Sequence, residues 1–358
     1  SMIVMRFLQG MGGSMVMATT FAIVVSVFPP EERGKALGIA VASVYAGISC
    51  GPFIGGALVT AFGWRSIFYI AVPLGAITFA TSCAKLRGEW AESRGEPFDW
   101  RGSLVYAAAI LMLITGASNL DQGVWAWALT MAGTAGLVHF LILESRTEYP
   151  VLNVNLLRDN RVFAFSNLAA LLNYAATFGV TFFLSLYLQF VKGLNPREAG
   201  TILILQPIIQ AVFSPLCGRL ADRFSAATVA TVGMGLCATG LGIAATITAT
   251  SPITLVLGTL VTLGFGFALF SSPNISVIMG SIPTRYLGVA SGLNSTMRTL
   301  GMMASMTVIT IIFSVFMGGQ AITPQTHGQF LDSMRTALLT CSVLCIIGIF
   351  FSFGRIRK

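Results

Sequence analysis

The sequence predicts an all-α protein that crosses a membrane about eleven times. Three observations predict this fold class. Hydrophobic residues make up 55% of the 358 residues and charged residues only 9%, whereas soluble domains carry roughly a quarter charged residues. The mean hydropathy is +0.82. Apolar stretches long enough for a membrane helix, which needs about 20 residues, recur along the whole chain.

The apolar stretches follow one another with mostly short connections. In chain order, the predicted spans are 2–28, 36–61, 66–85, 103–120, 124–143, 162–190, 199–217, 226–248, 253–281, 288–317 and 335–353. Two longer connectors, 86–102 and 144–161, carry charges of both signs, and 153–161 is predicted to form a helix at the membrane surface. Both connectors are too short to be catalytic domains.

The lysines and arginines fix the predicted orientation. If the C-terminus faces the cytoplasm, fifteen of the basic residues fall on the cytoplasmic side and four on the outer side. Membrane proteins keep their basic loops in the cytoplasm, so this split supports a cytoplasmic C-terminus and an outer N-terminus. The cytoplasmic set is Arg33, Lys35, Lys85, Arg87, Arg94, Arg101, Arg146, Arg158, Arg161, Arg219, Arg223, Arg285, Arg355, Arg357 and Lys358, and the outer set is Arg65, Lys192, Arg197 and Arg335.

A short internal repeat predicts two similar halves. Residues 34–38 (GKALG) and 288–292 (GVASG) each open a span in the same direction, and the next glycine follows nine residues later, at Gly47 and Gly301. Parallel repeats of this kind occur in transporters with two related lobes. We therefore expect a partial N-terminal bundle at 1–86, a linker with two extra spans at 87–161 and a six-helix bundle at 162–358. Matching halves would leave three spans missing ahead of Ser1.

The most distinctive motif lies in the second predicted span. Its residues are Gly38, Gly47, Gly51, Pro52, Gly55 and Gly56, with no charge between Gly38 and Arg65. Glycines at every fourth position share one helix face and let two membrane helices approach closely. Pro52 removes one helical hydrogen bond, so a bend is expected there.

These motifs resemble the major facilitator superfamily and, more narrowly, its fourteen-helix drug:proton antiporter branch (the EmrB/QacA type). The glycine pattern is similar to that branch's antiporter motif, 6–12 (RFLQGMG) to its Arg-x-x-Gln-Gly motif, and 218–223 (GRLADR) to its Gly-x-x-x-Asp-Arg loop motif. Residues 98–102 (FDWRG) resemble the stretch before the extra helix pair. The resemblance implies a two-lobed helix bundle that exports hydrophobic or amphipathic small molecules in exchange for protons, with the first three helices of the family absent.

Two arginines lie inside predicted spans, where an unpaired charge is costly. Arg6 with Gln9 forms the motif that the resemblance implies belongs to the proton pathway, although Arg6 is also close enough to the terminus to reach the outer headgroups. Arg298 lies about ten residues into its span and has no evident partner. A role in transport and a purely structural contact both remain open for it.

A cytoplasmic gate is predicted at the end of the seventh span. Gly218, Arg219, Asp222 and Arg223 form a charged cluster that can pair with a neighbouring helix terminus. Conformations that open inward must break such a contact. The alternative is that the cluster only anchors the loop on the positive side of the membrane.

Several amides are candidates for a cavity between the two halves, although polar side chains also bind neighbouring membrane helices. These candidates are Asn173, Gln206, Gln210, Asn274 and Asn294. All thirteen acidic residues fall in loops or at span edges, with Asp121 the closest to the interior of a span. The sequence therefore predicts no protonatable carboxylate deep in the membrane.

The residue pattern argues against enzymatic chemistry. The six cysteines lie in or beside apolar stretches without metal-ligand company, His139 and His327 are isolated, and no nucleotide-binding loop is present. We predict no metal, no cofactor and no nucleic-acid partner. The expected partners are a small-molecule substrate, protons and the lipid bilayer of a prokaryotic cytoplasmic membrane. The competing hypothesis is a truncated, non-transporting membrane protein or scaffold.

Overall fold

The computed structural model describes residues 2–86, 97–120, 123–318 and 320–355, and all regular elements in these ranges are helical. Eleven helices in the described residues are long and apolar enough to cross a membrane, which confirms the predicted number. Asp121, Arg87, Arg94, Arg357 and Lys358, used in the sequence argument, lie outside the described residues.

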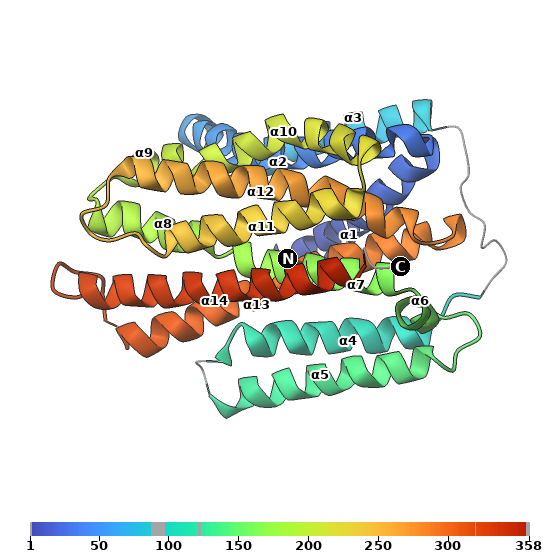
Figure 1. The fold of residues 1–358 in the computed structure, drawn as a ribbon. Coiled ribbons are helices and arrows are strands. Elements are labelled where there is room, and N and C mark those ends of the chain that lie inside the picture. The colour runs from blue at the N-terminus through green and yellow to red at the C-terminus, as the bar shows by residue number, and fades with distance from the viewer. Residues whose placement is uncertain (1, 87–96, 121–122, 319, 356–358) are drawn as a thin grey trace.

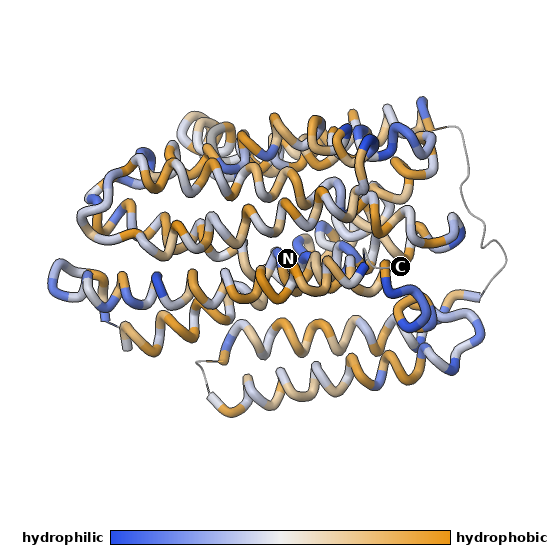
Figure 2. The backbone as a smooth tube through the Cα atoms, in the orientation of Figure 1, coloured by the Kyte–Doolittle hydropathy of each residue, from blue (hydrophilic) through white to orange (hydrophobic). Residues whose placement is uncertain are grey.

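The helices follow the predicted spans closely. They are α1 (Met2–Val27), α2 (Arg33–Phe62), α3 (Ser66–Lys85), α4 (Trp100–Ala117), α5 (Val124–Glu144), α6 (Val154–Asp159), α7 (Arg161–Thr177), α8 (Val180–Leu186), α9 (Pro196–Leu203), α10 (Leu205–Arg223), α11 (Ala226–Ala244), α12 (Ile253–Gly280), α13 (Leu287–Met317) and α14 (His327–Gly354). The short α6 lies within the predicted surface helix. Figure 2 shows apolar residues along the long helices and hydrophilic residues gathered mainly towards their ends.

Two predicted spans are interrupted. The span at 162–190 divides into α7, α8 and a π-helical turn (Tyr187–Val191), with a break before Gly179. The backbone N–H of Gly179 donates to Ser305 Oγ of α13 at 2.9 Å, and a Cβ on Gly179 would overlap Ile309. A side chain at position 179 would therefore require Ile309 to move. The second interruption, at Ile204, separates α9 from α10.

Helices α7 to α14 form one packed bundle. Helix α7 packs against α13 and α14, and α11 packs against α12 and α14 (Figure 1). Fully buried side chains such as Phe183, Tyr187, Leu241 and Phe330 form its main core. Close packing of this kind, with small residues at the contacts, holds helices together inside a membrane.

The earlier helices attach to this bundle separately. Helix α1 packs on α13, α2 packs on α10 and α12, and α4 and α5 form a pair along one side of the bundle (Figure 1). A second core cluster joins all three groups, since it contains Phe21 of α1, Leu37 of α2, Phe140 of α5, Phe163 of α7 and Ile278 of α12. Among the described residues of α3, only Ser66 is buried, so its apolar side chains are available to lipid.

Candidate functional site

The carboxylate of Asp222 links two parts of the chain that are far apart in sequence. Asp222, near the end of α10, accepts the N–H of Gly34 at 2.7 Å and the N–H of Lys35 at 2.9 Å. These two residues lie in the first turn of α2, where N–H groups lack helical partners and the helix dipole is positive. Hydrogen bonds to a charged group are the stronger class. One carboxylate of the C-terminal bundle therefore caps a helix of the N-terminal part.

Glycines bring the backbones of α2 and α10 together beside this cap. A Cβ on Gly218, one turn before Asp222, would overlap the carbonyl oxygen of Gly34. A Cβ on Gly38 would lie 2.5 Å from the carbonyl oxygen of Ser214. The contact therefore depends on glycine on both helices, as is common where membrane helices touch.

The predicted gate residues divide into two groups. Asp222 and Gly218 form the contact with α2, whereas Arg219 and Arg223 are exposed at the end of α10. The contact between α2 and α10 also includes α12, because the Ser272 hydroxyl donates to the Gly34 carbonyl at 3.2 Å.

The remaining glycines of the motif do not meet another helix. Within the part of the chain that the structure describes, no heavy atom lies within 4 Å of the Cβ position at Gly47, Gly51, Gly55 or Gly56. Helix α2 also continues through Pro52 as one helix. In the second copy of the repeat, by contrast, a Cβ on Gly301 would lie 2.5 Å from the Leu171 carbonyl oxygen of α7.

The predicted proton-pathway residues of α1 are close together. Arg6 Nη1 donates to Gln9 Oε1 at 2.9 Å, and the Arg6 guanidinium lies 5.1 Å from the ring centre of Phe68 in α3. A cation over an aromatic face is attracted by the ring quadrupole. Arg6 itself is exposed, and no carboxylate pairs with it among the described residues.

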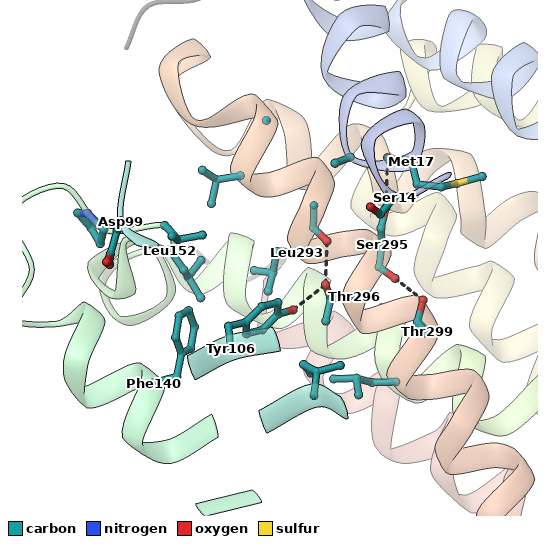
Figure 3. A pocket seen from close by; sticks show the side chains of 18 of the residues that line it. Ser14, Met17, Asp99, Tyr106, Phe140, Leu152, Leu293, Ser295, Thr296 and Thr299 are labelled. Atoms are coloured by element: carbon teal, nitrogen blue, oxygen red, sulfur yellow. Dashed lines mark hydrogen bonds between the residues drawn. The ribbon is translucent and has the colours of Figure 1, made fainter. Parts of the chain in front are cut away.

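Arg298 of α13 lines a cavity of about 800 Å³ between α1, α4 and α13. Its Nη2 donates to Met17 Sδ at 3.4 Å. Across the cavity, the Tyr106 hydroxyl of α4 donates to Thr296 Oγ1 of α13 at 2.8 Å (Figure 3). The polar residues of the lining are Ser14, Asp99, Tyr106, Ser295, Thr296, Arg298 and Thr299. An apolar wall with a few polar groups suits a small organic ligand.

The amides predicted to line a cavity lie elsewhere. All five are buried, and none of them lines the 800 Å³ cavity; they are Asn173, Gln206, Gln210, Asn274 and Asn294. Periodicity marks these residues as polar positions in apolar helices but does not tell which space they face. For Asn274 the structure gives a local role, because its Nδ2 donates to the Ser166 carbonyl at 3.1 Å and its Oδ1 accepts from Arg355.

Arg355 is the most deeply buried cation of the described chain. It is 6% exposed and also donates to Ser166 Oγ at 3.0 Å and to the Ala227 carbonyl at 3.4 Å. Burial lowers the pKa of its guanidinium to about 10, so the group stays charged at neutral pH. The hydrogen bonds of Arg355 therefore connect the end of α14 to α7, α11 and α12.

Replacing Asn274 by alanine is expected to lower the stability of the bundle by about 1.5–3 kcal/mol, because the buried guanidinium loses an acceptor. Thermal unfolding in detergent measures the loss. Thr239→Ala is the matched control, since this exposed hydroxyl bonds only to the Gly235 carbonyl of its own helix. An equal midpoint for the Asn274 variant and the wild type would contradict this account of Arg355.

Sequence reasoning missed two groups. Phe267 of α12 packs against Tyr45 of α2 and Tyr174 of α7, with ring centres 6.4 and 5.6 Å apart. Glu144 was placed at a span edge, yet it is only 2% exposed and lies beside Asp99. The sequence signal for the second group is Asp99 at the start of a helix, a position where aspartate caps the backbone.

Comparison with known proteins supports a transporter. The chain is 31% identical to the riboflavin transporter RibZ of Clostridioides difficile, over 99% of this chain and 77% of that protein. It is 31% identical to the multidrug resistance protein Stp of Mycobacterium tuberculosis, over 87% of this chain and 58% of that protein. It is also 28% identical to the tetracenomycin C resistance and export protein of Streptomyces glaucescens, over 89% and 60% of the two chains.

A solved structure agrees in fold. The human organic anion transporter MFSD10 (TETRAN) aligns with a TM-score of 0.64 at 13% identity, over 94% of this chain and 67% of that chain. The family model of the Major Facilitator Superfamily matches residues 1–306. Transport through a membrane, rather than catalysis, is the activity of this family's members found here. The chain belongs to the Major Facilitator Superfamily.

Proposed function

We propose that this chain acts in the export of hydrophobic or amphipathic small molecules, driven by protons, as in the fourteen-helix drug:proton antiporter branch. Residues 1–86 and 162–358 act as the two lobes, and 87–161 links them through the extra helix pair. The end of α14 faces the cytoplasm, by the distribution of basic residues. Arg6 with Gln9 and Arg298 serve the proton pathway, and the antiporter motif of α2 serves the closing of the lobes.

The observation that carries the proposal is the Asp222 cap on α2. It closes the two lobes against each other at one end through two hydrogen bonds and a glycine contact. Alternating access needs a contact that forms in one conformation and breaks in the other. A carboxylate that binds backbone N–H groups is suited to this, because such hydrogen bonds can break in one conformation and form again in the other.

The relatives favour export of organic compounds, and they also support a second candidate substrate. Stp and the tetracenomycin C protein are named for resistance or export. RibZ, which matches 99% of this chain, is named as a riboflavin transporter. A planar, polar heterocycle is therefore the second candidate, and the tyrosine and threonine hydroxyls around the cavity offer hydrogen-bonding groups for it.

The test is transport in proteoliposomes that contain the chain. An imposed pH gradient should drive ethidium uphill if the export proposal is right, and riboflavin uphill if the second candidate is right. A gradient without protein is the control. A correctly inserted chain that moves neither compound would contradict both and favour the scaffold hypothesis.

A further inference from the structure

Two carboxyl groups meet where α4 begins and α5 ends. Asp99 caps α4, and its Oδ1 accepts the Gly102 N–H at 2.9 Å. Glu144 is the last residue of α5, and its Oε2 accepts the Leu152 N–H at 2.7 Å. One oxygen of each carboxyl group is therefore occupied by a backbone donor.

The other oxygen of each group has no donor. Asp99 Oδ2 and Glu144 Oε1 are buried and lack a hydrogen-bond partner among the described residues. Both flank Gly102, where a Cβ would collide with each of them, so the two oxygens face the same position. The two unpartnered oxygens therefore share one small space.

Two ionised carboxylates are a poor fit for this space. A carboxylate is only an acceptor, so neither group satisfies the other, and two like charges repel strongly where water is excluded. A single proton solves both problems, because one carboxyl becomes a donor and one negative charge is removed. Acid pairs in proteins commonly share a proton for this reason.

Among the described residues around Glu144, no other group donates a hydrogen bond to the two unpartnered oxygens in place of this proton. Helix α4 presents Asp99, and the connector 145–153 presents backbone N–H groups. Tyr149 of the connector and Arg298 of α13 line the same cavity as Asp99. No lysine or arginine bonds to either unpartnered oxygen in the part of the chain described here.

We propose that Glu144 and Asp99 bind one proton between them, and that this proton holds the connector 145–153 in place beside the cavity. The connector contributes Tyr149, Pro150, Val151 and Leu152 to the cavity wall. Leu152 is bonded to Glu144 and belongs to the core cluster that joins the lobes. Loss of the proton leaves two carboxylate charges that repel each other, and this repulsion loosens the connector that forms the cavity wall. The existence of this proton site does not depend on the proposed export. Any part that the proton plays in driving transport rests on that proposed function.

Infrared difference spectra of the whole chain in lipid bilayers, recorded as pH is varied, test the proton directly. We expect a protonated carboxyl whose titration midpoint lies above the usual pKa of glutamate, about 4.3. The band should be absent in Glu144→Gln and present in Glu148→Gln, which changes an exposed carboxylate of the same connector. In Asp99→Asn the amide can donate to Glu144 and stabilise its ionised form, so protonation should require at least a tenfold higher proton concentration. A midpoint near 4.3, or no shift in Asp99→Asn, would overturn the proposal.

Thiol labelling tests the effect on the connector. In a Cys50→Ser background, a cysteine at Val151 should react at least tenfold faster above the titration midpoint than below it. The exposed native Cys83 in the same chain corrects for ionisation of the thiol itself. Glu144→Gln, which keeps a donor at this position, should make the labelling slow at every pH. If the labelling rate at position 151 depends on pH equally with and without Glu144→Gln, the acid pair does not hold the connector. This conclusion is the same whether or not the protein transports.

Discussion

Replacing Gly218 by valine is expected to abolish transport while the chain still inserts in the membrane. Even a Cβ at this position would overlap the Gly34 carbonyl oxygen, and the neighbouring atoms belong to the backbone of α2, which cannot rotate away. Overpacking of this kind costs about 1–3 kcal/mol or more. Because 1.4 kcal/mol is a factor of ten, Gly218→Ala should reduce population of the closed state about 5- to 150-fold, and valine should reduce it further.

Transport rates in proteoliposomes and the amount of protein in the membrane measure this effect. The matched control is Gly258→Ala in α12, where a Cβ would have no neighbour within 4 Å. Full transport by the valine variant would mean that α2 and α10 do not need to touch during the cycle. Loss of both insertion and transport in the alanine variant would instead assign Gly218 to assembly of the bundle.

Replacing Asp222 by asparagine is expected to open the lobes at the end where Asp222 caps α2. The amide keeps one acceptor oxygen but loses the negative charge and one of the two bonds to Gly34 and Lys35. A hydrogen bond to a charged group contributes about 1.5–3 kcal/mol, so the closed conformation should become roughly ten- to hundredfold less populated.

Spin labels report this change as a distance distribution. The labels can be placed at Glu31, just before α2, and at Arg223, the last residue of α10, because both are exposed. The exposed cysteines Cys50 and Cys83 are replaced by serine. Asp159→Asn is the control, because this carboxylate is exposed at the end of α6. Unchanged distances and transport in Asp222→Asn would show that the cap does not control closing.

Long apolar segments could be predicted from the sequence because their length and composition alone make them helical in a membrane. Asp222 and Gly218 could be singled out because they belong to a charged cluster at a helix end that resembles the family's loop motif. The break at Gly179 could not be predicted, because its N–H donates to Ser305 of α13, a partner that approaches only in the folded bundle.

The buried pair of carboxyl groups could not be predicted from the sequence pattern either. Asp99 and Glu144 are separated by two helices and lie at span edges, where carboxylates are usually solvated. Their burial follows from the close packing of α4 on α5, in which a Cβ on Gly133 would overlap the backbone of Leu113. The same limitation applies to Asn274, whose partner Arg355 comes from the other end of the bundle's sequence.

The cap on α2 recognises main-chain amides and not side chains. Every amino acid except proline carries such an amide, so the identity of residue 35 has little influence on whether Asp222 is bound. Position 34 is constrained by size alone, because the opposing helix leaves no volume there. Substitutions at exposed positions of this turn can therefore change its surface charge while the hydrogen bonds to Asp222 are kept.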